Sequence, residues 1–443
     1  MNYEYQKSPY RNLVVGVDTE VPILGGRSVP YVNFDNAATT PPFISVLSDI
    51  NKFSPWYSSI HRGDGYKSQV SSNVYENSRK LVLDFVNADP NNDTVIYVKN
   101  TTEGINKLSF RLCNGEGKCV ILSTDMEHHS NDLPWRGKYK VDYIKLDKYG
   151  GLSLEDLEQK LIHYNGLVKL VTVSGASNVT GFINPIHEVA TLAHKYNSKL
   201  LVDGAQLAPH VPIDMKPVNS IEHIDYLVFS GHKMYAPFGV GVLIGPKDNF
   251  RYGEPDYKGG GTVDTVTHDY VYWSDPPEKE EAGTPNVMGV VALAAAIRTL
   301  KSLGMHNIDM YEKKLAQYAT NRLMSIKDIE LYGTNRSFRN RVGIVPFNIK
   351  KLHHNTVAKI LSGEAGIGVR TGCFCAQPYV QKLLNITDEQ VANYSQLPKD
   401  KRPGMIRLSF GLYNDTNEID YLISALEYIV KDYKRLERKY AKP

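Results

Sequence analysis

A lysine and an aspartate each follow an apolar segment, where burying their charge would be costly. Lys233 lies in SGHK after the run DYLVFS, and Asp203 ends the run KLLVD. Burial lowers the pKa of a lysine, and a neutral amine can form a Schiff base with an aldehyde. A buried carboxylate needs a partner such as the protonated ring nitrogen of a cofactor. Together the two residues indicate a site for a cofactor with a carbonyl group. The alternatives are that Lys233 is a surface lysine in a loop and that Asp203 caps a helix or lies in a turn.

Two of the four cysteines, Cys373 and Cys375, lie close together in RTGCFCAQP. A thiolate is the reactive form of cysteine, and the upstream Arg370 would favour it. A disulfide across one residue would be strained, and a metal site would need two further ligands. We therefore predict a reactive thiol rather than a redox or metal pair. Cys113 and Cys119 frame CNGEGKC and are expected to be small apolar residues at element ends.

Three other patterns have residue types that occur in binding sites. Residues 100–104 (NTTEG) follow the apolar run TVIYVK, and the backbone N–H groups of a helix beginning there would favour a phosphate. A capping box is the ordinary alternative, and the two are compatible. His128 and His129 would point to opposite sides of an extended segment, so we expect no metal site. The glycine run 259–261 is more typical of a turn.

Apolar runs alternate with helical periods between residues 94 and 245, which predicts an α/β fold with a mainly parallel central sheet of doubly wound type. Several runs are apolar on both faces, as in strands covered on both sides. The expected strands are 94–99, 119–123, 141–146, 168–174, 199–203, 225–230 and 240–245, with a helix over 184–197. Ligands of such sheets bind at the carboxyl ends of strands.

The pattern changes after Pro285, which predicts a second, smaller domain of α+β type. We expect an N-terminal arm over 1–30 that packs with the small domain, a large domain over 31–285 and a small C-terminal domain over 286–443. A long helix over 286–303 would begin the small domain, and strands are expected at 341–349 and 405–411.

Composition limits the classes of function. The 443 residues include 51 basic and 48 acidic side chains, a formal net charge of +3. No basic excess indicates nucleic acid, and no run of about 18 apolar residues indicates a membrane helix. The first residues lack the apolar core of a secretory signal. Four cysteines suit a reducing compartment. We expect a cytoplasmic protein with no nucleic-acid or membrane partner.

Nine motifs in order resemble those of the fold-type I pyridoxal phosphate enzymes, class V aminotransferase family, and within it the cysteine desulfurases. The resemblance covers about Asn33 to Asn414. The motifs are DNAATT (35–40), NTTEGIN (100–106), EHHSN (127–131), SNVTG (177–181), DGAQ (203–206), SGHK (230–233), EAGTPN (281–286), RTGCFCAQP (370–378) and RLSFGLYN (407–414).

The resemblance implies a role for each matching residue. Lys233 would hold pyridoxal 5'-phosphate, Asp203 would pair with its ring nitrogen, and Gln206 would bond its phenolic oxygen. His128 would stack on the ring beside Asn178.

The resemblance also implies the phosphate contacts, which would be Thr102, the Glu103 amide, Ser230 and His232. Thr284 would reach the phosphate of the other subunit of a homodimer.

The implied reaction converts L-cysteine to L-alanine and leaves the sulfur on Cys375 as a persulfide. The resemblance implies substrate contacts at Arg407, Asn178, Asn36 and Arg370. Arginine suits the substrate carboxylate because its planar guanidinium can bind both oxygens. Lys233 would move the α-proton, and His128 is the candidate for protonating the intermediate or the leaving group. A sulfur-acceptor protein is a further possible partner.

Two departures keep other readings open. Cys373 stands where the related bacterial desulfurases usually have histidine, and Cys-Phe-Cys resembles the molybdenum cofactor sulfurases. The polar segment 385–404 lengthens the stretch between Cys375 and Arg407 and is expected to form a surface insertion. The alternatives are a related carbon–sulfur lyase, a selenocysteine lyase, a molybdenum cofactor sulfurase-like enzyme, or an inactive scaffold.

Overall fold

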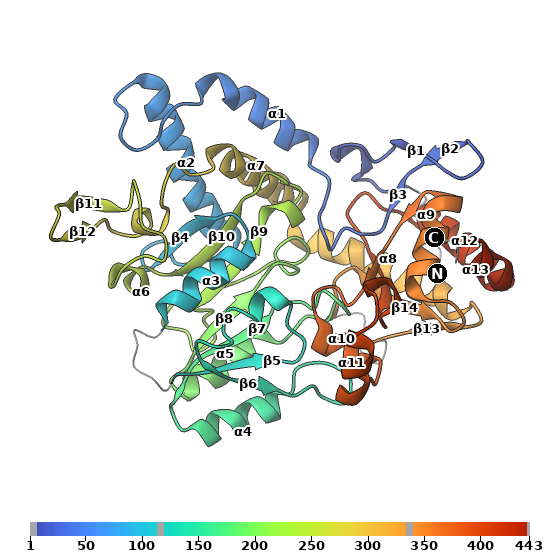
Figure 1. The fold of residues 1–443 in the computed structure, drawn as a ribbon. Coiled ribbons are helices and arrows are strands. Elements are labelled where there is room, and N and C mark those ends of the chain that lie inside the picture. Colours follow the sequence, from blue (N-terminus) through green and yellow to red (C-terminus); the bar gives the residue numbers. More distant parts are fainter. Residues whose placement is uncertain (1–6, 113–118, 334–339, 441–443) are drawn as a thin grey trace.

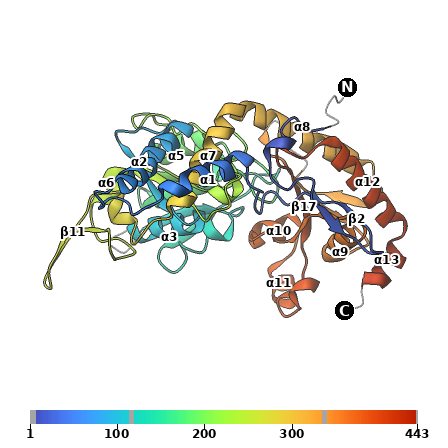
Figure 2. The same cartoon turned by 90° about the horizontal axis from the view of Figure 1, so that it is seen from above.

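The computed structural model describes residues 7–112, 119–333 and 340–440 (Figure 1). Two lobes are visible when the molecule is seen from above, with the first half of the chain mainly in one lobe and the C-terminal third in the other (Figure 2). The long helices α7 (Val287–Leu303) and α8 (Met305–Met324) lead from the first lobe to the second.

The large lobe is built on a seven-stranded sheet in the order β4-β10-β9-β8-β7-β5-β6. The strands are β4 (Asp93–Val98), β5 (Val120–Thr124), β6 (Lys140–Ile144), β7 (Val168–Ser174), β8 (Lys199–Asp203), β9 (Tyr226–Ser230) and β10 (Gly241–Pro246). Neighbours from β6 to β9 pair in parallel, whereas β10 is antiparallel to both β9 and β4. The sheet is therefore mainly parallel, as predicted.

Successive residues of β8 enter different hydrophobic clusters, because side chains alternate across a strand. Leu200 and Val202 belong to one cluster and Leu201 to another, and all three are fully buried. On one side, α1 (Ile44–Phe53) and α2 (Tyr66–Phe85) pack against α7. Other helices of this lobe are α3 (Thr101–Arg111), α4 (Leu154–Tyr164), α5 (Ile186–Lys195) and α6 (Lys247–Arg251).

The small lobe contains a four-stranded antiparallel sheet in the order β13-β14-β17-β16. Its strands are β13 (Ile329–Leu331), β14 (Ile344–Ile349), β16 (Arg370–Gly372) and β17 (Met405–Ser409). Its helices include α9 (His354–Ala365), α10 (Gln377–Leu383), α11 (Asp388–Ser395), α12 (Thr416–Lys431) and α13 (Tyr433–Tyr440). The α+β character expected for this region is therefore present, and α11 lies in the segment expected to be an insertion.

The N-terminal segment contacts the small lobe. The hairpin of β1 (Glu20–Pro22) and β2 (Ser28–Pro30) precedes β3 (Val32–Asn33), which pairs in parallel with β15 (Ile367–Gly368). An ion pair of 2.8 Å joins Arg11 to Glu418 of α12. The three-domain division remains a prediction, since these contacts do not define its boundaries.

Two shorter features complete the fold. The hairpin of β11 (Val263–Val266) and β12 (Val271–Trp273) projects away from the large lobe (Figure 2). Short 3₁₀ helices cover Arg11–Leu13, Ser54–Trp56, His129–Asn131, Gly231–Lys233, Glu278–Glu280 and Lys399–Lys401.

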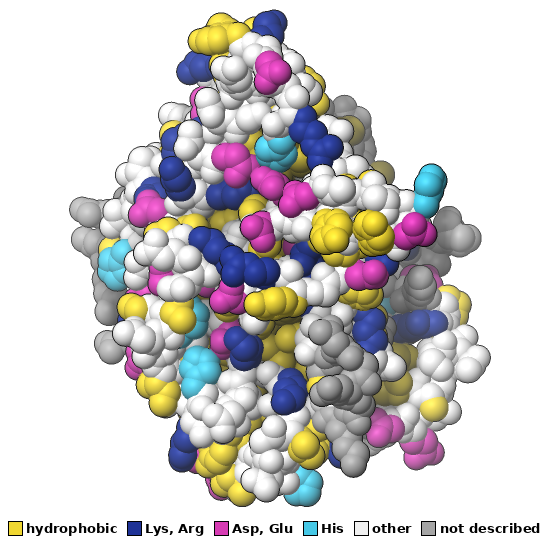
Figure 3. All heavy atoms as spheres, turned by 90° about the vertical axis from the view of Figure 1, so that its left-hand side faces the viewer, with side chains coloured by type: hydrophobic (Ala, Val, Ile, Leu, Met, Phe, Trp, Pro, Cys, Tyr) yellow, Lys and Arg dark blue, Asp and Glu magenta, His cyan; other side chains and the backbone are white. Residues whose placement is uncertain are grey.

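Within the described residues, no single helix has the length and apolar composition of a membrane span. The pair α7 and α8 passes that test only together, with a bend of 79° between them. Acidic and basic side chains lie next to one another on the face shown in Figure 3.

Candidate active site

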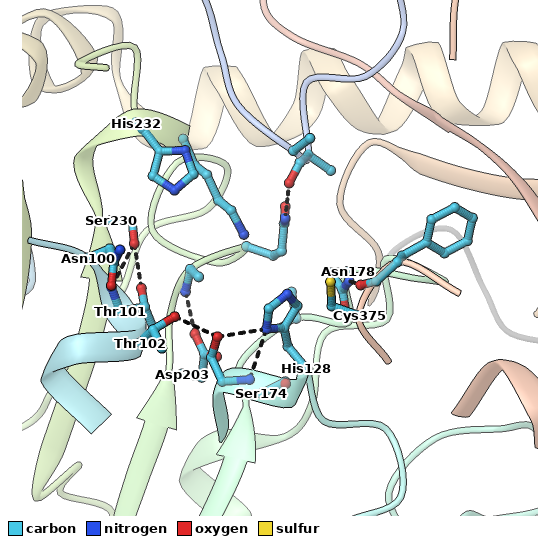
Figure 4. A pocket seen from close by; sticks show the side chains of 18 of the residues that line it. Asn100, Thr101, Thr102, His128, Ser174, Asn178, Asp203, Ser230, His232 and Cys375 are labelled. Carbon is cyan, nitrogen blue, oxygen red and sulfur yellow. Dashed lines mark hydrogen bonds between the residues drawn. The ribbon is translucent and has the colours of Figure 1, made fainter. Parts of the chain in front are cut away.

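A cavity of about 220 Å³ lies at the carboxyl ends of three neighbouring strands. Ser174 ends β7, Asp203 ends β8 and Ser230 ends β9, and the first turn of α3 completes this side of the cavity (Figure 4). Eleven of the predicted site residues line it. They are Thr102, His128, Asn178, Asp203, Gln206, Ser230, His232, Lys233, Arg370, Cys375 and Arg407.

Lys233 is held in a short helical turn between β9 and β10. The Gly231 N–H donates to the Val240 carbonyl at 2.8 Å, and the His232 carbonyl accepts from the Thr40 N–H at 2.9 Å. Burial lowers the pKa of the Lys233 amine to about 8, with Arg407 acting in the same direction and Asp203 opposing it. The lowered pKa makes the neutral amine, the form that a nucleophile requires, more abundant near physiological pH than in an ordinary lysine.

Asp203 is 5% exposed and accepts a 2.9 Å hydrogen bond from the Ala205 N–H at Oδ1. Burial raises the pKa of this carboxyl group, and the charge of Lys233 partly offsets the effect. A cationic N–H group placed in the cavity would stabilise the ionised form. The side chain thus has the chemistry expected of a partner for a ring nitrogen.

His128 is neutral in the cavity wall. Its Nδ1 accepts from the Ser130 N–H at 3.1 Å, so the remaining ring proton is on Nε2. Burial lowers the pKa of this imidazole to about 3, and the charge of Lys233 contributes. The Oγ of Ser130 also lies 3.0 Å from Nδ1 and 2.7 Å from the Thr102 Oγ1. A neutral ring with one outward N–H can stack and donate a hydrogen bond.

A buried carboxyl group lies behind His128. Glu127 accepts hydrogen bonds from Thr124 Oγ1, Asn131 Nδ2, and both the N–H and the Oγ of Ser174. Burial raises its pKa to about 7, and these donors oppose the rise. The network joins the segment that carries His128 to the end of β7.

The first turn of α3 has the features of an anion-binding site. Asn100 caps the helix by accepting from the Glu103 N–H at 3.0 Å, and the Thr101 N–H donates to Ser230 Oγ at 2.8 Å. His232 lines the same cavity, and burial lowers its pKa to about 4. A phosphate here would meet a helix N-terminus together with hydroxyl and imidazole groups.

Arg407, on β17, is buried and ordered by three groups. Its Nη1 donates to the Asn178 carbonyl at 2.8 Å, and its Nη2 lies 3.1 Å from Asp35 Oδ1. The guanidinium also covers the Phe374 ring, and its buried Nε has no hydrogen-bond partner. Arg370 is more exposed and lies 3.7 Å from the other oxygen of Asp35. Both arginines line the cavity, so a carboxylate could bind there.

The thiol segment forms a tight turn at the cavity. The Ala376 N–H donates to the Cys373 carbonyl at 2.8 Å, and the two central residues, Phe374 and Cys375, have φ of 52° and 56°. Positive φ at both central positions is typical of a type I′ turn and costs on the order of 1–3 kcal/mol for each non-glycine residue. Surrounding contacts hold it: Asn178 Nδ2 donates to the Phe374 carbonyl and the His129 N–H to the Cys375 carbonyl, both at 2.7 Å.

The two cysteines of this turn have different surroundings. Cys375 is exposed and lines the cavity, whereas Cys373 is half-buried and its Sγ lies 3.6 Å from the Pro403 carbonyl. Burial raises the pKa of the Cys373 thiol, and the neighbouring Cys375 adds to the rise. Cys119 is disulfide-bonded, so the expectation that it is merely a small apolar residue was wrong, and Cys113 lies outside the described residues.

Three predicted site residues do not line this cavity. Asn36 is 1% exposed and donates to the carbonyls of Asn33 and Ser409, so its amide braces the end of β17. The Glu103 N–H is used by the Asn100 cap. Thr284 and the Glu103 side chain line a separate cavity of about 240 Å³.

Several lining residues were missed from the sequence, although most adjoin a quoted motif. Asn100, Thr101 and Ser130 lie inside motifs, and Ser174 ends a strand that was predicted correctly. Phe374 stands between the two cysteines, and only the fold shows its ring beneath a guanidinium. Among the described residues, no group of three or more His, Cys, Asp or Glu side chains could hold a metal ion.

The model of the family "Aminotransferase class-V" matches residues 32–422. The chain belongs to the class-V aminotransferase family. Members similar to it include a cysteine desulfurase of Haloferax volcanii, which is 34% identical over 409 residues, 90% of this chain and 89% of that protein.

Solved structures of the family are also similar to this one. The apo structure of a cysteine desulfurase from Thermococcus onnurineus has a TM-score of 0.80 at 33% identity, covering 90% of this chain and 95% of that one. The S-sulfonic acid form of an Escherichia coli cysteine desulfurase has a TM-score of 0.76 at 28% identity, covering 90% and 95%. The predicted fold-type I class is confirmed.

Proposed function

We propose that the protein is a pyridoxal phosphate-dependent cysteine desulfurase, which converts L-cysteine to L-alanine and takes the sulfur as a persulfide on Cys375. The observation that carries the proposal is the meeting of three groups in one cavity: the amine of the half-buried Lys233, the exposed thiol of Cys375 and the guanidinium of Arg407. The similarity to cysteine desulfurases over 90% of the chain supports the choice of substrate.

The residues present fit pyridoxal 5'-phosphate. The buried Gln206 Oε1 has no hydrogen-bond partner, while its Nε2 donates to the Ala37 carbonyl at 2.6 Å, so the amide has spare capacity for a hydroxyl group. Asp203 would hold the ring nitrogen and the α3 terminus with Ser230 would hold the phosphate. When bound, the cofactor supplies an aldehyde that joins amines and a ring that stores electrons.

The substrate carboxylate would bind between Arg407 and Arg370. Asp35 would keep both guanidinium groups in place, because it lies 3.1 Å from the first and 3.7 Å from the second. The amide of Asn178 would fix the edge of the same pocket, since its carbonyl and its Nδ2 are both engaged. This arrangement would direct the substrate sulfur toward the turn that carries the thiol.

Three groups would move protons or sulfur. The Lys233 amine, neutral once its proton is lost, would accept the α-proton of the substrate and return it. His128 Nε2–H would donate to the substrate. The thiolate of Cys375 would attack the substrate sulfur, so that L-cysteine and the enzyme thiol give L-alanine and the enzyme persulfide.

We also propose that the protein acts as a homodimer and passes its sulfur to an acceptor protein. Thr284 is exposed and does not line the cavity that contains Lys233; it lines the separate cavity of about 240 Å³. This position suits a residue that contacts the phosphate bound by a second subunit. The insertion around α11 is exposed next to the thiol turn and is the surface we propose for an acceptor. Analytical ultracentrifugation of wild type and Thr284→Tyr tests the dimer, because the larger side chain should weaken it.

The decisive experiment compares wild type with Cys375→Ala after addition of L-cysteine. The wild type should form alanine and a persulfide in equal amounts, and the variant should retain the cofactor absorbance but form neither. Alanine formed at the full rate by Cys375→Ala would refute the assignment. Pyruvate and ammonia in place of alanine would instead indicate a lyase.

A further inference from the structure

The thiol turn presents its two cysteines to different parts of the molecule. Cys375 faces the cavity that also contains Lys233 and Arg407, and Cys373 does not line that cavity. The sulfur of Cys373 lies instead beside the Pro403 carbonyl, at the end of the insertion. Pro403 is part of the wall of a separate groove of about 770 Å³, which α11 also borders.

The turn holds the backbones of the two cysteines close together. Cys373 and Cys375 occupy the first and third positions of a four-residue turn closed by the 2.8 Å hydrogen bond from Ala376 to Cys373. A single ring, that of Phe374, separates them in sequence, and it is turned away to lie against Arg407.

We propose that Cys373 is a second sulfur station, which takes the terminal sulfur from the Cys375 persulfide and holds it on the side of the turn next to Pro403. This inference rests on the proposed desulfurase function. The Cys373 thiolate attacks the outer sulfur of the Cys375 persulfide, the sulfur–sulfur bond to Cys375 breaks, and Cys375 leaves as a thiolate. The proton of the Cys373 thiol passes to solvent and is regained by Cys375, so no oxidant or reductant is needed.

The transfer has a consequence for stoichiometry. Once Cys375 is a thiol again, it can take sulfur from a second substrate molecule while Cys373 still holds the first sulfur. Without any acceptor, one chain should therefore form two alanines before it stops, and a chain with a single station should form one.

The test is a quenched burst experiment with holoenzyme, L-cysteine and no added thiol. Alanine is counted per chain, and the persulfides are trapped by alkylation and located by tandem mass spectrometry within the peptide 371–382. Wild type should give a burst of two alanines and sulfur on both cysteines, with Cys375 labelled first. Cys373→Ser and Cys373→Ala should halve the burst and carry sulfur on Cys375 alone.

Each other outcome has a distinct meaning. A wild-type burst of one with Cys373 unlabelled would overturn the second station and leave the proposed function intact. A Cys373–Cys375 disulfide with released sulfide would also overturn it, because Cys373 would then remove the sulfur rather than hold it. Sulfur on Cys373 in Cys375→Ala would show direct transfer from substrate and overturn the relay. No alanine and no sulfur in wild type would refute the desulfurase function itself.

Discussion

The guanidinium of Arg407 lies 4.9 Å from the centre of the Phe374 ring. This contact joins the residue proposed to bind the substrate carboxylate to the turn that carries the reactive thiol. Asn178 strengthens the connection, because it is hydrogen-bonded to both Arg407 and Phe374. Substrate binding and thiol position should therefore depend on one another.

Phe374→Leu should uncouple the two groups. The variant keeps apolar bulk but loses the cation–π contact, which is worth about 1 kcal/mol, so we expect kcat/KM for L-cysteine to fall by about fivefold. Steady-state kinetics of alanine formation measure the effect. Phe374→Tyr retains the ring and should stay within about twofold of wild type; an equal loss in both variants would contradict the stacking argument.

Asp35→Asn should destabilise the protein. The substitution removes the anionic partner of the buried Arg407 guanidinium, at a cost of about 2 kcal/mol in the free energy of unfolding. Urea titrations followed by fluorescence measure the change. Asp64→Asn, at an exposed position, is the matched control and should leave the midpoint unchanged. Equal midpoints for the two variants would mean that the ion pair contributes little.

Cofactor attachment to the unliganded protein should become faster as pH rises through about 8. The pKa of Lys233 is lowered to about 8, so the neutral amine that attacks an aldehyde increases about tenfold between pH 7 and pH 9. The rate is followed by the absorbance of the Schiff base after mixing with pyridoxal 5'-phosphate. Lys233→Ala should give no such band. A rate that rises only near pH 10.5 would show an ordinary lysine.

Glu281→Gln should weaken the large lobe near the Thr284 segment. Glu281 accepts hydrogen bonds from both Nη atoms of Arg79 at 2.7 and 2.8 Å and from the Tyr75 hydroxyl at 2.7 Å. Loss of this buried charge should lower the free energy of unfolding by about 3 kcal/mol. Thermal unfolding compares it with Glu278→Gln, an exposed neighbour that should have no effect.

The strand ends that shape the site could be predicted from the sequence because local patterns determine them. Segments 168–174 and 199–203 match β7 and β8 at both ends, and Lys233 follows β9 as expected. The antiparallel direction of β10 and the short strand β16 could not be foreseen, because strand pairing depends on contacts between distant segments.

Long-range contacts also explain what the sequence missed within the site. Asp35 and Arg407 form an ion pair across most of the chain, and no local pattern links them. The Glu103 amide is a local case: it was expected at the phosphate, but Asn100 accepts its N–H through the helix cap that the sequence offered as the alternative. Asn36 was expected at the substrate, but its side chain satisfies backbone groups beside β17.

The antiparallel direction of β10 has an evolutionary consequence. Since β10 pairs with β9 in the opposite direction, Lys233 lies on a short connection that is fixed at both ends to neighbouring strands of the sheet. The thiol is carried by a different segment, between β16 and α10 of the small lobe. Mutations at residues 373–376 could therefore vary the sulfur chemistry without moving the strands that hold the amine.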